Sequence, residues 1–160
     1  THAAEMKQRE LTLLRNPQLK YLPAYILKDT ESFFAKYEKM APEKRKELMS
    51  GFKMLQDFVR RFAKAGGKIH TGSDPNHVVP GYAMHAELQM LVEAGLTTLQ
   101  AISTASINVA QAWGKDKEYG SVEKGKVADF FIVRGDPLKN ISDTQKVDAV
   151  YMGGKKIDTS

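Results

Sequence analysis

The stretch Gly67-Lys68-Ile69-His70-Thr71-Gly72-Ser73-Asp74-Pro75 decides the fold prediction for this chain. Residues 68–71 have extended character, and Gly72 permits a turn without a steric penalty. Pro75 keeps Asp74 out of a helix, because the residue before a proline favours extended geometry. The pattern predicts a short strand ending on a carboxylate, which is where α/β barrels place catalytic and metal-binding groups. The alternative, that Asp74 only forms a turn with its own backbone, stays open at this point.

The composition is that of an ordinary globular protein. The chain has 160 residues, of which 42% are hydrophobic and 27% charged, and it is long enough to bury a core. It has no cysteine, which excludes disulfides, thiolate metal sites and cysteine nucleophiles. The first residues do not have the pattern of a signal peptide, and no apolar run approaches the ~18 residues of a membrane span, so we expect neither feature. We expect a cytoplasmic protein without a membrane partner, although export of the parent protein stays open.

The net charge of +5 is unevenly distributed. Residues 1–65 carry 14 of the 24 basic side chains and 8 of the 19 acidic ones, a net of +6. A basic half raises the question of nucleic-acid binding. However, the basic residues alternate with acidic ones, as in residues 42–47, which is typical of a solvated helix face. We therefore expect no nucleic-acid partner, with a basic helical nucleic-acid-binding segment kept as an alternative.

Helices are predicted for most of residues 1–113. The first three cover about 4–14, from Asp29 or Thr30 to Met40, and from Pro42 to Gly66-Gly67. The proline lies in the first turn of the third helix, where its missing N–H costs no hydrogen bond. The third has an apolar face that we expect to be buried, formed by Phe52, Leu55, Val59 and Phe62. Two more are predicted over about 82–94 and 98–113, the latter starting with a capping box of Thr97 and Gln100.

Short strands are predicted after residue 114. Ala128 to Val133 is nearly continuous in apolar residues and is predicted to be a buried strand. Residues 147–152 and 155–157 flank Gly153-Gly154, a two-residue hairpin signal. One barrel-type strand cannot form a parallel sheet by itself, and the first residue is Thr1 rather than methionine. We therefore expect a processed, truncated or cloned part of a larger protein.

Four motifs in fixed order resemble the C-terminal part of the amidohydrolase superfamily, with imidazolonepropionase-like and Xaa-Pro or Xaa-Arg dipeptidase-like metal hydrolases as the most similar members. The resemblance covers about residues 66–157 and rests on the following segments: His70-Thr71-Gly72-Ser73-Asp74; Pro80-Gly81 with His85-Ala86-Glu87-Leu88; Val92 to Thr97 continuing into Ala101, Thr104, Ala105, Asn108 and Ala110; and Gly120 to Asp129 followed by Gly135-Asp136-Pro137-Leu138.

The resemblance implies a role for Asp74. In that family the aspartate that ends the eighth barrel strand binds the metal and takes a proton from the attacking water, and this position falls on Asp74. His77 and His85 are candidates for substrate binding, with a structural role open for His85. The family's other metal ligands have no counterpart here, and a catalytic zinc normally needs three or more protein ligands. We therefore expect no tightly bound metal and no activity in this chain alone.

The resemblance implies an α/β fold, namely the C-terminal fragment of a (β/α)8 TIM-type barrel, residues 1–113, plus closing strands of a small β-sandwich subdomain, residues 114–160. The expected function of the intact protein is metal-dependent hydrolysis of C–N bonds in a cyclic amide or dipeptide-like substrate, with a divalent cofactor, zinc by preference. The remainder of the same polypeptide is the expected protein partner, with a homo-oligomer open. The alternative from another class is a non-catalytic interaction module.

Overall fold

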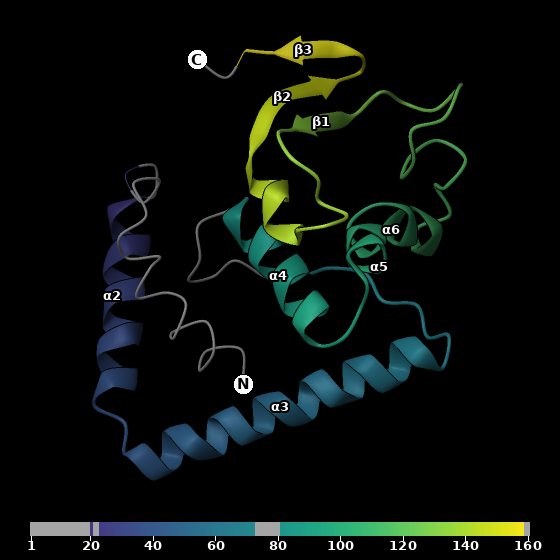
Figure 1. The fold of residues 1–160 in the computed structure, drawn as a ribbon. Helices are drawn as coiled ribbons and strands as arrows, with labels where there is room; N and C mark the ends of the chain where they lie inside the picture. The colour runs from purple at the N-terminus through teal and green to yellow at the C-terminus, as the bar shows by residue number, and fades with distance from the viewer. Residues whose placement is uncertain (1–19, 21–22, 73–80, 159–160) are drawn as a thin grey trace.

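The computed structural model describes residues 20, 23–72 and 81–158 (Figure 1). The predicted helix over 4–14 lies outside this part. The described elements, in chain order, are helices α2 (Ala24–Glu38), α3 (Pro42–Lys64), α4 (Tyr82–Glu93), α5 (Thr98–Thr104) and α6 (Ile107–Ala112), strand β1 (Phe130–Val133), the 3-10 helix η2 (Ile141–Gln145), and strands β2 (Val147–Met152) and β3 (Lys155–Ile157). None of these helices combines the length and the apolarity needed to cross a membrane.

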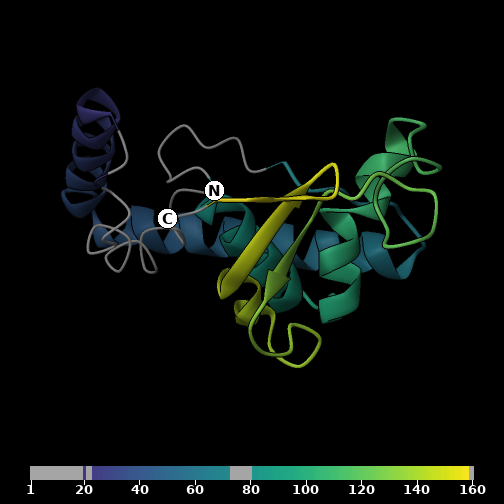
Figure 2. The same cartoon turned by 90° about the horizontal axis from the view of Figure 1, so that it is seen from above.

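Helices α2 and α3 form the N-terminal part of the described chain. Helix α2 begins at Ala24, so the prediction that Asp29 or Thr30 caps it is wrong: both lie inside the helix. Helix α3 begins at Pro42, as predicted, and stops where Gly66 takes a positive φ of 82°. Helix α2 stands beside one end of α3, away from the sheet, in both ribbon views (Figures 1 and 2).

The apolar face predicted for α3 is only partly buried. Phe52 is buried, whereas Leu55 and Phe62 are 46% and 42% exposed. Phe58, between them, is 62% exposed and stacks on Phe62 with ring centroids 5.9 Å apart. The reason is the arrangement of the helices: α3 runs past the end of the α4–α6 group and no other described element covers the rest of its length (Figure 1).

The core lies where α4, α5 and η2 meet. Leu88, Ala101 and Ile141 are buried there, and four partly buried side chains pack around them, namely Leu91, Val92, Ile102 and Ala105. Helix α4 matches its predicted bounds, and the capping box of Thr97 and Gln100 that opens α5 is confirmed, with both reciprocal hydrogen bonds present. Ile141 comes from the C-terminal part of the chain, so that part shares this core with α4 and α5.

The single helix predicted over 98–113 is wrong, because the structure has two helices, α5 and α6, separated at Ala105 and Ser106. In a continuous helix the Thr104 carbonyl would accept the backbone N–H of Asn108. Here that carbonyl accepts the backbone N–H of Thr71 at 3.0 Å instead. The break thus coincides with a hydrogen bond from a residue 33 positions earlier in the sequence.

The three strands form one antiparallel sheet in the order β1-β2-β3. Its β2–β3 hairpin turns at Gly153 and Gly154, both with positive φ, which confirms the hairpin prediction. The predicted burial of residues 128–133 is wrong: Phe131 and Ile132 in β1 are 51% and 44% exposed. A sandwich would cover such side chains with a second sheet, and the described residues form only this one.

Residues 68–71 are not a strand in the structure, so that prediction is also wrong for the described chain. A barrel strand is defined by hydrogen bonds to parallel neighbours on both sides. The described residues offer no such neighbours, and side chains and backbone groups of the helices bind this segment instead.

Candidate functional site

The segment before Asp74 is held by helices α5 and α6 and the turn between them. Asn108 in α6 donates its side-chain amide to the Ile69 carbonyl at 2.8 Å. The Thr71 backbone N–H donates to the Thr104 carbonyl, at the C-terminal end of α5, where helix carbonyls lack partners within the helix. The Thr71 hydroxyl lies 3.4 Å from the same carbonyl. These bonds fix residues 69–71 without a sheet.

Helix α4 holds the next residue. The backbone N–H of Gly72 donates to Oε1 of Glu87 at 3.0 Å. The second oxygen of Glu87, Oε2, is buried and accepts no hydrogen bond from the described residues. Asp74 and His77 themselves lie outside the described residues, so these two predicted positions stay untested. What the structure shows is that Glu87 binds Gly72, two residues before Asp74 in sequence.

His85 lies at the junction of α4 with the C-terminal part of the chain. Its Nδ1 is 3.0 Å from the Thr144 hydroxyl in η2, and its ring meets Phe131 of β1 edge-on, with centroids 6.4 Å apart. The Thr144 hydroxyl donates its proton to the Ile141 carbonyl, so it accepts from His85, and the Nδ1–H tautomer follows. Burial lowers the pKa of His85, which favours the neutral ring.

One helical turn further along α4, Gln89 donates to the Ser142 hydroxyl at 3.2 Å. His85 and Gln89 are four residues apart and so lie on one face of the helix. Both bind side chains of η2, which directly precedes strand β2. These two hydrogen bonds therefore link α4 to the part of the chain that forms the sheet. The contacts of His85 in the structure are thus with protein groups, and its predicted role in substrate binding stays a prediction.

A divalent metal implied by the resemblance can be tested against these residues. Among residues 20, 23–72 and 81–158, no three His, Asp or Glu side chains gather as metal ligands. Glu87, which binds Gly72 two residues before Asp74 in sequence, has a buried Oε2 that accepts no hydrogen bond from the described residues. The described residues therefore do not form a metal site among themselves, and Asp74 would add one oxygen ligand to them.

The roles of Glu87, Asn108 and Thr104 were not predicted from the sequence, although all three lie in the motifs that carry the resemblance. Their positions were the available signal: Glu87 is two residues after His85, and Asn108 lies within the helix predicted over 98–113. Their partners lie 15, 39 and 33 residues away, namely Gly72, Ile69 and Thr71. Such pairings become visible only in the folded chain.

Comparison with known proteins identifies the family of this chain. The model of the amidohydrolase family matches residues 29–157. The imidazolonepropionase of Symbiobacterium thermophilum is 38% identical over 76 residues, which cover 46% of this chain and 18% of that protein. The adenine deaminase of Methanococcoides burtonii is 28% identical over 118 residues, or 69% of this chain and 19% of that protein.

Solved structures give the same family. A Xaa-Pro dipeptidase with bound methionine in its active site superposes with a TM-score of 0.64 and 27% identity, over 84% of this chain and 32% of that one. Phenylurea hydrolase B superposes with a TM-score of 0.55 and 32% identity, over 62% of this chain and 26% of that one. The chain thus spans a third or less of each of these relatives. Because the family match extends over most of its length, the chain belongs to the amidohydrolase family.

Proposed function

We propose that this chain is the C-terminal part of a metal-dependent amidohydrolase that hydrolyses C–N bonds in a cyclic amide or a dipeptide-like substrate. The family match over residues 29–157, which includes Asp74, is the observation that carries the proposal. The names of the relatives support the bond type. An imidazolone ring, a phenylurea and an Xaa-Pro dipeptide each contain a carbonyl carbon bonded to nitrogen.

In the proposed reaction, Asp74 has two roles. It supplies one carboxylate ligand to a divalent ion, zinc by preference, and it accepts the proton of the attacking water. When bound, such an ion lowers the pKa of water toward neutrality and polarises the substrate carbonyl. A carboxylate positioned beside the water can accept that proton as a general base. Such a base contributes about 10²–10⁴ in rate. His77 is proposed to face the substrate, and the same role is kept for His85.

The other metal ligands are proposed to come from the rest of the barrel, outside this chain. The described residues do not gather three ligands, and the chain spans only 18% to 32% of the relatives compared above. The proposed fold of the intact protein is a (β/α)8 barrel with a small β-sandwich, and the strands that would flank residues 68–71 in that barrel are not among the described residues. Residues 1–113 and 114–160 would be the corresponding two parts.

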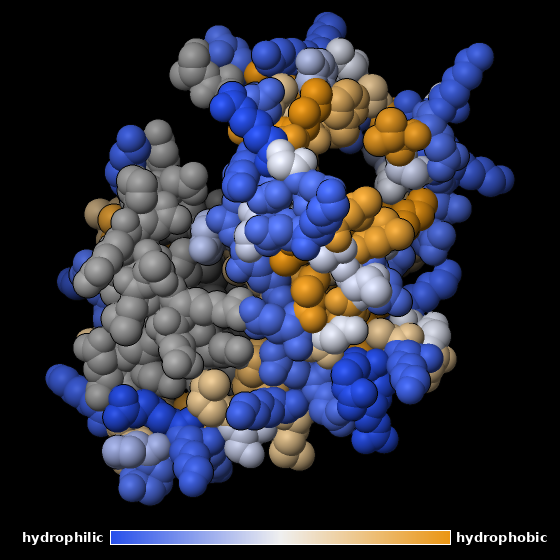
Figure 3. All heavy atoms as spheres, in the orientation of Figure 1, coloured by the Kyte–Doolittle hydropathy of each residue, from blue (hydrophilic) through white to orange (hydrophobic). Residues whose placement is uncertain are grey.

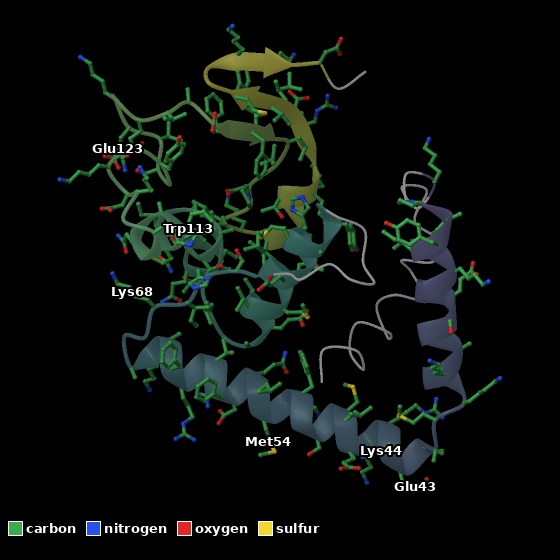
Figure 4. All side chains as sticks on the ribbon, turned by 180° about the vertical axis from the view of Figure 1, so that it is seen from behind. Glu43, Lys44, Met54, Lys68, Trp113 and Glu123 are labelled. Carbon is green, nitrogen blue, oxygen red and sulfur yellow. The ribbon has the colours of Figure 1, made fainter. Side chains whose placement is uncertain are left out.

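Exposed apolar side chains support this arrangement. Trp113 at the end of α6 is 78% exposed and Met54 of α3 is 72% exposed. Met54 lies on the side of α3 that faces away from α4 (Figure 4). Apolar side chains also gather over the sheet and the α5–α6 region on the face seen in Figure 3. Large exposed apolar areas mark surfaces that another protein segment covers. In our proposal the remainder of the polypeptide covers them.

The same exposed side chains favour the second candidate, a non-catalytic interaction module.

A nucleic-acid binder has less support, since basic residues of α3 pair with acidic ones. Lys44 lies 2.8 Å from Glu47, and Asp57 pairs with Arg60 and Arg61. The hydrogen bond from Arg60 to Asp57 is the main cause that lowers the pKa of that carboxyl. Retention on immobilised DNA that falls steeply with salt would favour nucleic-acid binding instead.

The proposal is tested on the full-length protein that contains this chain, purified with zinc, manganese or no added metal. The substrates are a panel of Xaa-Pro dipeptides, cyclic amides and arylureas, assayed for release of the free amine or carboxylate. Turnover of at least one class that a chelator abolishes and zinc restores is the expected result. No turnover of any class by a metal-loaded, folded protein would support the interaction module.

A further inference from the structure

The short helix η2 lies between α4 and the sheet (Figure 1). Two side chains on one face of α4 hold it there. His85 Nδ1 donates to the Thr144 hydroxyl at 3.0 Å, and Gln89 donates to the Ser142 hydroxyl at 3.2 Å. Strand β2 directly follows η2 in the chain, so a contact that holds η2 on α4 also holds the sheet there.

His85 is the titratable member of this contact, and its half-buried ring suits the neutral form. The ring meets Phe131 of β1 edge-on, with centroids 6.4 Å apart. Its acceptor, the Thr144 hydroxyl, belongs to a residue only 5% exposed and donates its own proton to the Ile141 carbonyl. A second proton on the ring would go to Nε2, which is bonded to no described group. The contact is therefore built for an uncharged imidazole.

The charged groups on the elements around His85 are engaged with other partners in the described structure. These groups are Asp143 with Lys146 and the Asp136 amide, Asp129 with the Gly153 amide, Arg134 with Asp148, and Glu87 with the Gly72 amide. The hydrogen bond from Lys146 is the main cause that lowers the pKa of Asp143, so this carboxylate keeps its charge in mildly acidic solution. One turn before His85 on α4 lies Tyr82, whose phenol is uncharged near neutral pH.

Proton binding by His85 is linked to the position of η2. In the closed form, with η2 on α4, burial lowers the pKa of His85, because the cation loses hydration. In an open form, with η2 away from α4, the ring meets water and its pKa returns to the ordinary value of about 6.5. The open form then binds more protons between these two pKa values. The ratio of open to closed form rises as the pH falls through this range.

The moving part is expected to stay intact and attached. The Arg134 amide donates to the Lys146 carbonyl at 2.8 Å, which joins the end of β1 to the residue between η2 and β2. The Thr98 hydroxyl donates to the Leu138 carbonyl at 2.6 Å and ties the loop before η2 to the start of α5. Ile141 of η2 is part of the buried core, which favours the closed form.

We propose that the contact of His85 with Thr144 is a proton-sensitive switch: the neutral ring holds η2 and the sheet on α4, and protonation of the ring releases them. This conformational role goes beyond the proposed hydrolysis and does not depend on it. Local opening of one part of a fold takes less free energy than global unfolding. Each unit of difference between the pKa values of the two forms changes the opening equilibrium about tenfold.

The test is hydrogen exchange at single amides of the full 160-residue chain at pH 7.5 and pH 5.5, with each rate divided by the intrinsic rate at that pH. The reporters are the amides of Arg134 and Lys146, which bond within the C-terminal part, and the reference is the Ala101 amide in α5. At pH 5.5 the protection of both reporters should fall about threefold or more, while that of Ala101 holds within about twofold. An equal fall at all three amides would mean global unfolding, and unchanged protection would mean no opening. Either result overturns the proposal.

Two variants assign the effect to His85. His85→Asn keeps an N–H donor for Thr144 but does not titrate, so its reporters should have the same protection at both pH values. Gln89→Ala is the matched control, because it removes the neighbouring bond to Ser142 and keeps the titrating ring. It should lower protection at both pH values and keep the pH-dependent fall at its wild-type size. If His85→Asn loses protection between the two pH values as the wild type does, another group is the trigger and the proposal is wrong.

A measurement on the wild type keeps the proposal testable if a variant does not fold. An NMR titration of the His85 ring gives both its pKa and its tautomer. We expect a pKa below the ordinary value of about 6.5 and a neutral ring with its proton on Nδ1. A ring that titrates at the ordinary value, or that carries its proton on Nε2 when neutral, would contradict the proposal.

Discussion

The side-chain amide of Asn108 donates a 2.8 Å hydrogen bond to the backbone carbonyl of Ile69, 39 residues earlier in the chain. This bond ties helix α6 to the segment that leads to Asp74. In a barrel, hydrogen bonds from neighbouring strands would hold residues 68–71, whereas here a helix side chain binds Ile69. The helices that follow Asp74 in sequence therefore hold the segment that precedes it.

Asn108→Asp should destabilise the fold, because a carboxylate cannot donate to the Ile69 carbonyl. Leaving a partly buried acceptor without its partner costs about 1–3 kcal/mol. Urea unfolding measures the loss. Gln111→Ala is the control: it removes the exposed 3.1 Å bond between Lys68 and Gln111 on the same pair of segments and should cost less than about 0.5 kcal/mol. Equal losses in the two variants would contradict a special role for Asn108.

Gly120→Ala should be strongly destabilising. A Cβ at Gly120 would lie 2.8 Å from Ala110 Cβ and 2.8 Å from Ile107 Cα, against helix α6. Such overpacking costs about 1–3 kcal/mol, in addition to the strain of a positive φ. Gly125→Ala is a matched control, because Gly125 has the same φ of 93° but open space around it. The difference in unfolding free energy between the two variants isolates the contact with α6.

The stability of the fold should fall as the pH drops below about 6.5, the ordinary pKa of histidine. Burial lowers the pKa of His85 in the folded chain. The unfolded state then binds more protons between the two pKa values, so stability is full above the unfolded pKa and is lost as the pH falls through this range. Protonation places a charge beside the Thr144 hydroxyl and the Phe131 ring.

His85→Asn isolates this contribution, since asparagine offers an N–H donor to Thr144 but does not titrate. The melting temperature of the wild type should decrease from pH 7.5 to pH 5.5 more than that of His85→Asn. Identical slopes for the two proteins would show that the other titrating groups account for the pH dependence. His85 would then contribute nothing to it.

Local signals in the sequence predicted local structure. The capping box of Thr97 and Gln100, Pro42 at the start of α3 and the Gly153-Gly154 hairpin all depend on neighbours within a few residues, and the structure confirms them. The family resemblance was likewise confirmed, because its motifs are spread over most of the matched region.

Except for the start of α2, which lies at Ala24 rather than at Asp29 or Thr30, the errors involve partners that are distant in sequence or are not among the described residues. The predicted helix over 98–113 breaks at Ala105 and Ser106, next to the Thr104 carbonyl that accepts the Thr71 N–H. Residues 68–71 and β1 were expected to be a barrel strand and a buried strand, and both expectations require further strands to pair with them or cover them. The pairing of Glu87 with Gly72 could not be read from the motif either, since spacing in sequence says nothing about which face of α4 meets that segment.

This chain on its own is expected to retain no stoichiometric metal. Its described residues gather no three ligands, and Asp74 adds a single carboxylate, whereas a catalytic zinc site uses at least three protein ligands. Metal analysis after dialysis against a weak chelator measures this. One equivalent of zinc retained through Asp74 would mean that the chain forms a complete site, which contradicts the proposal that the other ligands lie elsewhere.

The central claim, that Asp74 is both metal ligand and base, is tested most directly by measuring zinc content and turnover of Asp74→Asn in the full-length protein. The change keeps the size of the side chain but removes the charge and the proton acceptor. We predict an unchanged melting temperature of the metal-free protein, reduced zinc content, and turnover lowered about 10²–10⁴-fold or more. An Asp74→Asn protein that keeps its zinc and at least half of the wild-type turnover would contradict the account.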